Sequence, residues 1–169
     1  MLYTSAEAAK LVRKLNEEQN VLKQKENKSA LFVAAIEEDV ESVRPDYDYE
    51  EVQKLLAELE AKVRKVKHAI NTFNLTTQVP GFDMTVDQML VYIPQLSEKK
   101  SKLTWMAGTL PKERVSASGY GAKTIVEYRY ANYDIAKAEA DLAAVTDELA
   151  RAQTALDVIN NSATMEIEL

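Results

Sequence analysis

Apolar side chains recur at alternating spacings of four and three residues between Asp48 and Asn74. Because an α-helix turns once in about 3.6 residues, this spacing collects them into one narrow seam. The seam residues are Val52, Leu56, Leu59, Val63, Val66, Ile70 and Phe73. The pattern predicts a helix over 48–74 that needs partner helices to cover it.

A second seam runs without interruption from about residue 132 to residue 160. It consists of Ile135, Ala138, Leu142, Val145, Leu149, Ala152, Leu156 and Ile159. Both helices have about 27 residues and would be about 40 Å long. Since both repeats are close to 3.5 residues, the pattern predicts that 48–74 and 132–160 pair directly, with left-handed packing at a shallow angle.

Helix starts are marked by a hydroxyl or carboxylate at the N-cap, followed three residues later by Glu or Gln. Three such pairs are Thr4 with Glu7, Asp48 with Glu51, and Thr85 with Gln88. They place two further helices at about 4–28 and 85–108. Pro94 lies inside the latter, which predicts either a kink or two shorter helices in succession.

The period changes from helical to two near residues 124–130 and again at the C-terminus. In the first stretch Val126, Tyr128 and Tyr130 alternate with Glu127 and Arg129, after a Gly119-Tyr120-Gly121 turn. This favours a short strand, a candidate half of a hairpin with residues 113–117. In the tail, Met165, Ile167 and Leu169 alternate with Glu166 and Glu168, which predicts a C-terminal strand over 164–169.

The predicted tail strand needs a partner. A helix of about 40 Å would carry the tail away from 124–130 of the same chain. We therefore expect a second, antiparallel chain to pair with it, with Arg129 facing Glu166 or Glu168. The fold class that emerges is a mainly α, antiparallel bundle of three to four long helices with coiled-coil-like packing and a small β element. A chain of 169 residues is predicted to form a single domain over 1–169.

Composition narrows the functional classes. Lys and Arg number 21 against 27 Asp and Glu, so the net charge is −6, which argues against nucleic acid and anionic membranes as partners. There is no cysteine for a disulfide, a thiolate metal site or a nucleophile. No apolar stretch approaches the ~20 residues that span a bilayer, and the N-terminus lacks a signal-peptide pattern. These features predict a cytoplasmic protein.

The end of the second predicted helix carries a family resemblance. Ile70-Asn71 is followed one turn later by Asn74, then by a short loop and by Thr85-Val86-Asp87, which opens the next helix. This arrangement resembles the septicolysin-like proteins, a largely uncharacterised family of small bacterial and phage-associated helical proteins. The resemblance implies a helical fold over nearly the whole chain, and the family name suggests a cytolysin.

The same region supplies a candidate polar site. Its members are His68, Asn71, Asn74, Thr85 and Asp87. One interpretation is a small polar pocket at the loop, and the other is a helix cap with hydrogen bonds between helices. His68 is the only histidine and has no nearby Ser or Cys nucleophile in the sequence, so we predict no catalytic role for it.

Three other clusters each have a functional and a structural interpretation. The acidic residues Glu37, Glu38, Asp39 and Glu41 are a candidate cation site or a solvated face. The basic residues Lys62, Arg64, Lys65 and Lys67 are a candidate phosphate contact or, again, a solvated face. The aromatic residues Tyr120, Tyr128, Tyr130, Tyr133 and Trp105 are a candidate stacking platform or packing at a junction of strand and helix.

No pair of titratable groups presents itself as acid and base, or as nucleophile and base. We therefore predict a non-enzymatic oligomerisation or interaction protein without catalytic residues, cofactor or metal. Its homo-oligomer would form through helices 48–74 and 132–160 and strands 124–130 and 164–169. The alternatives are a membrane-active protein, for which the apolar segment 30–36 is the best insertion candidate, and a weak nucleic-acid binder.

Overall fold

The computed structural model describes residues 1–115 and 126–169, and it is mainly helical with two small antiparallel strand pairs. The predicted fold class is therefore confirmed. The long helices are α1 (Ser5–Ser29), α3 (Tyr49–Thr76), α4 (Val86–Ala107) and α5 (Ile135–Ser162), and α2 (Val40–Val43) is a single turn. Each end of a long helix lies within three residues of its prediction.

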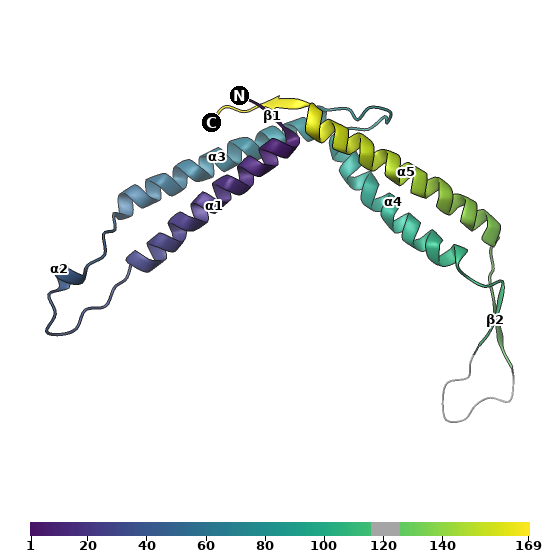
Figure 1. Ribbon diagram of the computed structural model, residues 1–169, viewed down its shortest axis with the longest axis horizontal. Coiled ribbons are helices and arrows are strands. Elements are labelled where there is room, and N and C mark those ends of the chain that lie inside the picture. The colour runs from purple at the N-terminus through teal and green to yellow at the C-terminus, as the bar shows by residue number, and fades with distance from the viewer. Residues whose placement is uncertain (116–125) are drawn as a thin grey trace. The chain divides into compact units, whose positions relative to one another are not determined.

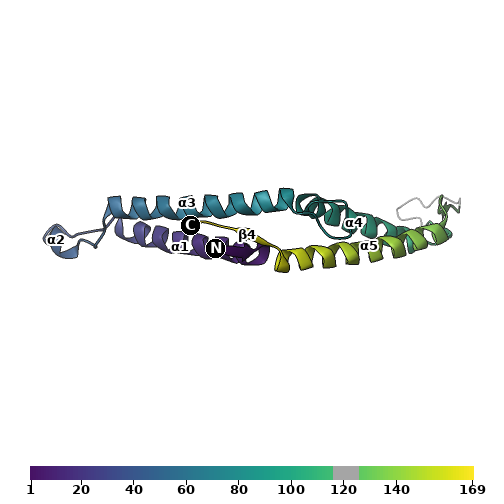
Figure 2. The same ribbon diagram turned by 90° about the horizontal axis from the view of Figure 1, so that it is seen from above.

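The first strand pair joins the two ends of the chain. Strand β1 (Leu2–Thr4) runs antiparallel to β4 (Thr164–Glu166), with Tyr3 opposite Met165. Beyond the strands, the Met1 amino group donates to the Ile167 carbonyl at 3.1 Å, and the Ile167 N–H donates to the Met1 carbonyl at 2.9 Å. The termini accordingly lie side by side (Figures 1 and 2).

This pairing corrects one prediction. The C-terminal strand exists, but its partner is the N-terminus of the same chain rather than a second copy. Leu2–Thr4 is too short for its alternation to be recognised in the sequence, and only the folded chain brings it beside β4. Within the chain Arg129 faces Glu113, with 4.0 Å between Nη1 and Oε2. The expected pairing of Arg129 with Glu166 or Glu168 of a second chain stays a prediction.

The second strand pair is the predicted hairpin. Strand β2 (Lys112–Arg114) is antiparallel to β3 (Tyr128–Tyr130), and Val115 N–H donates to the Glu127 carbonyl at 3.0 Å. The predicted turn at Gly119-Tyr120-Gly121 and the adjoining parts of 113–117 and 124–130 lie outside the described residues.

The chain, predicted as one domain, forms two compact units by its contacts. The first unit comprises Met1–Thr77 and Val158–Leu169, and the second comprises Gln78–Asp157. In the first unit, α1 and α3 lie side by side and antiparallel (Figures 1 and 2). Gln19 donates to Glu60 at 3.1 Å and Gln53 donates to Glu26 at 2.6 Å across this helix pair. Strand β1 contacts α1, and β4 contacts α3.

In the second unit, α4 and α5 lie side by side and antiparallel (Figures 1 and 2). Tyr92 on α4 donates to Glu148 on α5 at 3.5 Å, and Tyr133 donates to the Met106 carbonyl at 2.8 Å. Within their units α3 packs on α1 and α5 lies along α4, whereas the seams predicted a direct pairing of 48–74 with 132–160. Each long helix thus pairs with the long helix next to it in sequence, as consecutive elements of a chain usually do.

Pro94 lies within one continuous helix, so the alternative of two separate helices is wrong. The start of that helix is held by a capping box at Thr85 and by buried Val86 and Met89. Ahead of it, Val79 N–H donates to the Met84 carbonyl at 2.9 Å, and Gly81 adopts a positive φ of 80° that favours glycine. Within residues 1–115 and 126–169, no helix has the length and apolar character of a membrane span.

Candidate interaction surface

The seam between α1 and α3 is closed at one end and open at the other. Near the β1–β4 strands, Ala8 and Val66 are 0% exposed and Ile167 is 4% exposed, because the strands cover this end of the helix pair. Toward the connection between the helices, Leu22 and Leu59 are only half-buried and Leu55 is 41% exposed. Two helices alone cover only one side of an apolar stripe, so this end lacks a covering layer.

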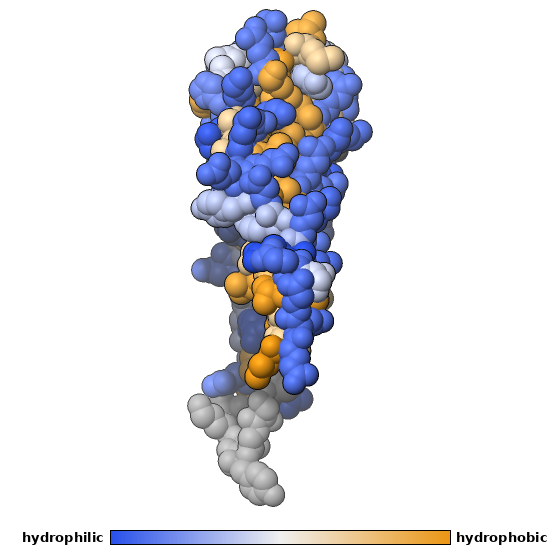
Figure 3. Space-filling model, turned by 90° about the vertical axis from the view of Figure 1, so that its left-hand side faces the viewer, coloured by the Kyte–Doolittle hydropathy of each residue, from blue (hydrophilic) through white to orange (hydrophobic). Residues whose placement is uncertain are grey.

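A groove of about 590 Å³ occupies the open end of the α1–α3 seam. We call it the hairpin groove, and it is lined by Lys14, Glu17, Glu18, Val21, Leu22, Lys25, Leu55, Glu58, Leu59 and Lys62. Its floor is apolar, and its rim alternates between lysines and glutamates. The view of Figure 3 shows apolar residues gathered in a strip with hydrophilic residues on both sides.

The hairpin groove continues into a second hollow of about 250 Å³ that shares Leu22, Lys25 and Leu55 with it. Here the Glu26 carboxylate accepts from the Tyr47 hydroxyl at 2.9 Å, in addition to its bond from Gln53. Partial burial and this bond to a carboxylate raise the pKa of Tyr47. These contacts fasten the end of the connecting segment to α1 and α3.

The connecting segment carries exposed apolar side chains. Leu31 is 87% exposed, Val33 is 92% exposed and Ile36 is fully exposed. Phe32 is partly covered by Arg44, whose Cζ lies 5.3 Å from the ring centroid. The structure leaves most of the apolar surface of this segment uncovered. Such a contiguous exposed run is typical of a binding surface.

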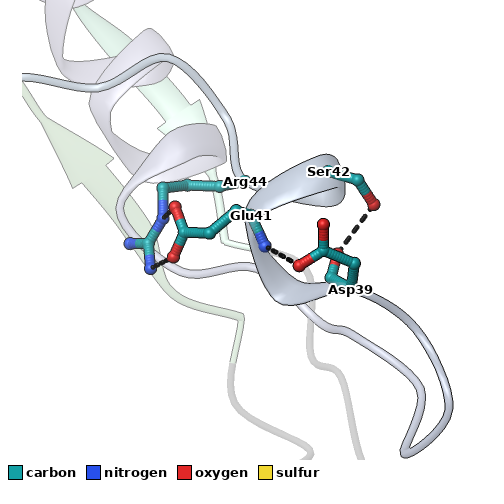
Figure 4. A network of polar contacts seen from close by, with 4 residues as sticks. All are labelled: Asp39, Glu41, Ser42 and Arg44. Carbon is teal, nitrogen blue, oxygen red and sulfur yellow. Dashed lines mark hydrogen bonds and ion pairs between the residues drawn. The ribbon is translucent and has the colours of Figure 1, made fainter.

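An acidic run, 37–41, follows this apolar segment and forms a capped turn (Figure 4). Asp39 accepts from the Glu41 N–H at 3.2 Å, and the Ser42 hydroxyl donates to the Asp39 carbonyl at 2.7 Å. Arg44 donates twice to Glu41, at 2.9 and 2.7 Å, which lowers the pKa of Glu41 and raises that of Arg44. Across the described ranges, no three His, Asp or Glu side chains group so that they could hold a metal ion.

The predicted polar site is divided between the two units. His68 and Asn71 are exposed and Asn74 is half-buried on the last turns of α3, in the first unit. The end of α3 is capped by the backbone, since the N–H of Thr77 donates to the Phe73 carbonyl at 2.9 Å. His68 borders a hollow of about 330 Å³, together with Lys65, Ala69, Glu166, Ile167 and Glu168.

Thr85 and Asp87 belong to the second unit. Thr85 is the N-cap of α4: its hydroxyl accepts from Gln88 N–H at 3.4 Å, and the Gln88 side chain accepts from Thr85 N–H at 2.9 Å. Asp87 lies in the first turn, where a carboxylate complements the helix dipole. The structure therefore gives Thr85 and Asp87 roles at a helix start, and a pocket shared by all five residues stays a prediction.

The aromatic residues on and near the β2–β3 strand pair lie largely at the surface. Lys112 Nζ is 4.2 Å from the ring centroid of Tyr128 and 5.4 Å from that of Tyr130, so the lysine lies over both rings. Trp105 is 70% exposed, while the Tyr133 hydroxyl bonds to the end of α4. Tyr120 lies outside the described residues. The two tyrosines of β3 therefore make cation–π contacts with Lys112 of the same chain.

Sequence reasoning missed Val21 and Leu55, the exposed apolar residues of the hairpin groove. Both are neighbours of seam residues, in the pairs Val21-Leu22 and Leu55-Leu56. Adjacent apolar residues widen a helical stripe beyond what one antiparallel partner covers. This widening was the available signal that the α1–α3 pair needs a further layer.

Comparisons with known proteins indicate the fold only. Neither a protein-family model nor a curated protein matches the chain. A crystal structure of a functionally unknown conserved protein from Corynebacterium diphtheriae is similar, with a TM-score of 0.57 and 18% sequence identity. The similarity covers 98% of this chain and 100% of that one. The resemblance to septicolysin-like proteins stays a prediction.

Proposed function

We propose that the protein is a non-enzymatic interaction module that associates with a second copy of itself through the hairpin groove. The observation that carries this proposal is the open end of the α1–α3 seam, where Val21 is 53% exposed and Leu55 is 41% exposed. Fully burying an exposed side chain of this kind contributes about 1.5–3 kcal/mol, and the half of each side chain that is still exposed here contributes a corresponding fraction. Association is therefore the simplest way to cover the seam.

The rim of the groove suits a second copy in particular. It carries Lys14, Lys25 and Lys62 together with Glu17, Glu18 and Glu58. In a two-fold interface both copies contribute the same surfaces, so basic rim residues of one copy can meet acidic residues of the other. A rim with one sign of charge would attract only a partner of the opposite charge, whereas this mixed rim suits a chain that itself carries both signs.

The other elements once expected at the interface have partners within the chain. Helix α5 lies along α4, and its seam residues Val145, Leu149 and Ala152 are buried. Strand β4 pairs with β1, and β3 pairs with β2. The proposed interface therefore retains only one of the predicted contact elements, helix 48–74, which is α3 in the structure. It also includes α1.

The proposed association is tested by sedimentation velocity over about a hundredfold range of concentration. We expect the average mass of the wild-type protein to rise with concentration. The double variant Val21→Glu, Leu55→Glu should remain monomeric, because it places charges on the apolar floor. Val91→Glu is the matched control, since Val91 is an exposed apolar residue of α4, at 58% exposure.

A wild-type protein that keeps the monomer mass over the whole range would overturn the proposal. So would a mass that rises equally in the wild type and in the double variant. Circular dichroism of each variant shows whether the helices are retained, which we expect because both substituted positions are exposed and Glu is a good helix former.

A further inference from the structure

We propose that the occupant of the hairpin groove is the apolar segment Leu31–Ile36 of the second copy, with the acidic run 37–41 of that copy lying against the basic residues of α3. This inference rests on the proposed self-association and names the surface that the partner contributes. Each copy then donates one segment and accepts one, as a two-fold interface requires.

The dimensions of segment and groove agree. Six extended residues span about 20 Å. Along α1 the groove runs from Lys14 to Lys25, and eleven helical steps correspond to about 16 Å. The segment is therefore long enough to span the groove, and Leu31 and Val33, which share one face of an extended segment, can reach the apolar floor together.

The chemistry of the two surfaces also agrees. Leu31, Val33 and Ile36 have no cover in their own copy, as their exposure shows, and the groove floor presents Val21, Leu22, Leu55 and Leu59. Joining the two surfaces removes both from water, and this apolar burial favours association.

Charge favours one direction of the segment in the groove. The tip of the unit, residues 37–51, contains eight acidic residues and one basic residue, Arg44, which pairs with Glu41. The far end of the groove carries Lys14 and Lys62, and α3 continues with the exposed residues Arg64 and Lys65. If the acidic tip of one copy lies at this basic end of the other copy's groove, opposite charges meet. In the reverse direction the acidic tips of the two copies would lie close together and repel each other.

The segment is positioned to reach outward rather than back onto its own groove. Ala30 is still helical, with φ −66° and ψ −28°, and its N–H donates to the Glu26 carbonyl at 2.8 Å. The segment that starts at Leu31 extends beyond the end of α1 (Figure 1). A second copy meets the segment without unwinding α1.

The apolar contact is tested with the triple variant Leu31→Ser, Val33→Ser, Ile36→Ser. We expect its dissociation constant, measured by sedimentation, to rise at least about tenfold. The protein should keep its thermal stability when monomeric, since these side chains are exposed. The matched control is Leu90→Ser, Val91→Ser, which changes exposed apolar residues of α4.

The charge contact is tested by exchanging signs between segment and groove. The acidic-side variant is Glu37→Lys, Glu38→Lys, and the basic-side variant is Lys62→Glu, Lys65→Glu. Each variant alone should associate less than the wild type, because each homodimer then repels at both contacts. An equal mixture of the two should associate again, since every contact in the mixed dimer joins opposite charges. A folding defect does not produce this recovery.

The outcomes separate the inference from the proposed function. A monomeric wild-type protein overturns both. A dimer that tolerates the triple variant and shows no recovery in the mixture overturns the inference alone, and the groove then has another occupant. Flotation with phosphatidylcholine vesicles covers the membrane alternative: vesicle binding that the triple variant abolishes, without any effect on dimer mass, assigns the segment to lipid and overturns the inference.

Discussion

Thr85 illustrates how one hydroxyl places the start of a helix. It satisfies an otherwise unpaired N–H at the beginning of α4 and was recognisable in the sequence, as were Thr4 and Asp48 at the starts of α1 and α3. Caps are readable because donor and acceptor lie within three residues of each other. Thr85 and Asp87, two residues of the candidate polar site, thus have structural roles at the start of α4, as N-cap and as a carboxylate in the first turn.

The contribution of this cap is measurable. Thr85→Ala should lower the free energy of unfolding by about 1 kcal/mol in urea denaturation, because the Gln88 N–H loses its partner. Thr104→Ala on the same helix is the control. The hydroxyl of Thr104 donates to the Lys100 carbonyl in the helix interior, where Ala is the better helix former, so little or no loss is expected. Equal losses would contradict the capping role.

Glu7 predicts a pH dependence. Hydrogen bonds from the backbone N–H and the side chain of Thr4 lower the pKa of Glu7 below its ordinary value of 4.5. A lowered pKa in the folded state means that the stabilisation is present above the ordinary pKa and is lost as pH falls through the lowered one. Between about pH 6 and about pH 3, the wild type should lose more stability than Glu7→Gln, which keeps an uncharged capping side chain. Parallel pH profiles would refute this.

At the scale of elements, strand β4 closes one end of the first unit. Met165 and Ile167 are buried while Glu166 and Glu168 are exposed, as the alternation in the tail predicted. The strand contacts α3 and pairs with β1, so it acts as the third layer that the open end of the seam lacks. The difference between the two ends of one helix pair is therefore whether a strand covers it.

Ile167 and Leu169 allow this closure to be tested within one tail. Ile167→Ala should cost about 2–5 kcal/mol of stability, because a buried isoleucine is replaced by a cavity. Leu169→Ala should change stability by less than about 0.5 kcal/mol, since Leu169 is exposed. Chemical denaturation of both full-length variants provides the comparison. Equal effects would show that the tail does not pack as described.

At the scale of the whole molecule, buried and exposed apolar residues lie in different stretches of the helices. The part of the α5 seam from Val145 to Ile159 is buried, whereas on α3 Leu59 is half-buried and Leu55 is exposed. Stability and association are therefore expected to reside in different parts of the chain, and this difference can be measured in a single experiment.

Hydrogen exchange at low and high protein concentration should separate the two regions. Amide exchange over 31–36 and 55–62 should slow as concentration rises, because a second copy covers these residues. Exchange over 149–156 should not change, since this part of α5 contains the buried residues Leu149, Ala152 and Leu156. Uniform slowing throughout the chain, or none over 31–36, would contradict the proposed interface.

The sequence by itself determined the long helices, their seams and the N-caps of three of them, together with three of the four short strands. These features depend on periodicity and on contacts within a few residues, which the order of amino acids displays directly. Only the tertiary structure decided which helices pack against each other, that β1 pairs with β4, and that the hairpin groove stays open. Those outcomes depend on connections and on layers distant in sequence: Leu55 has the same helical neighbours wherever α3 packs, but its exposure depends on what lies across from it.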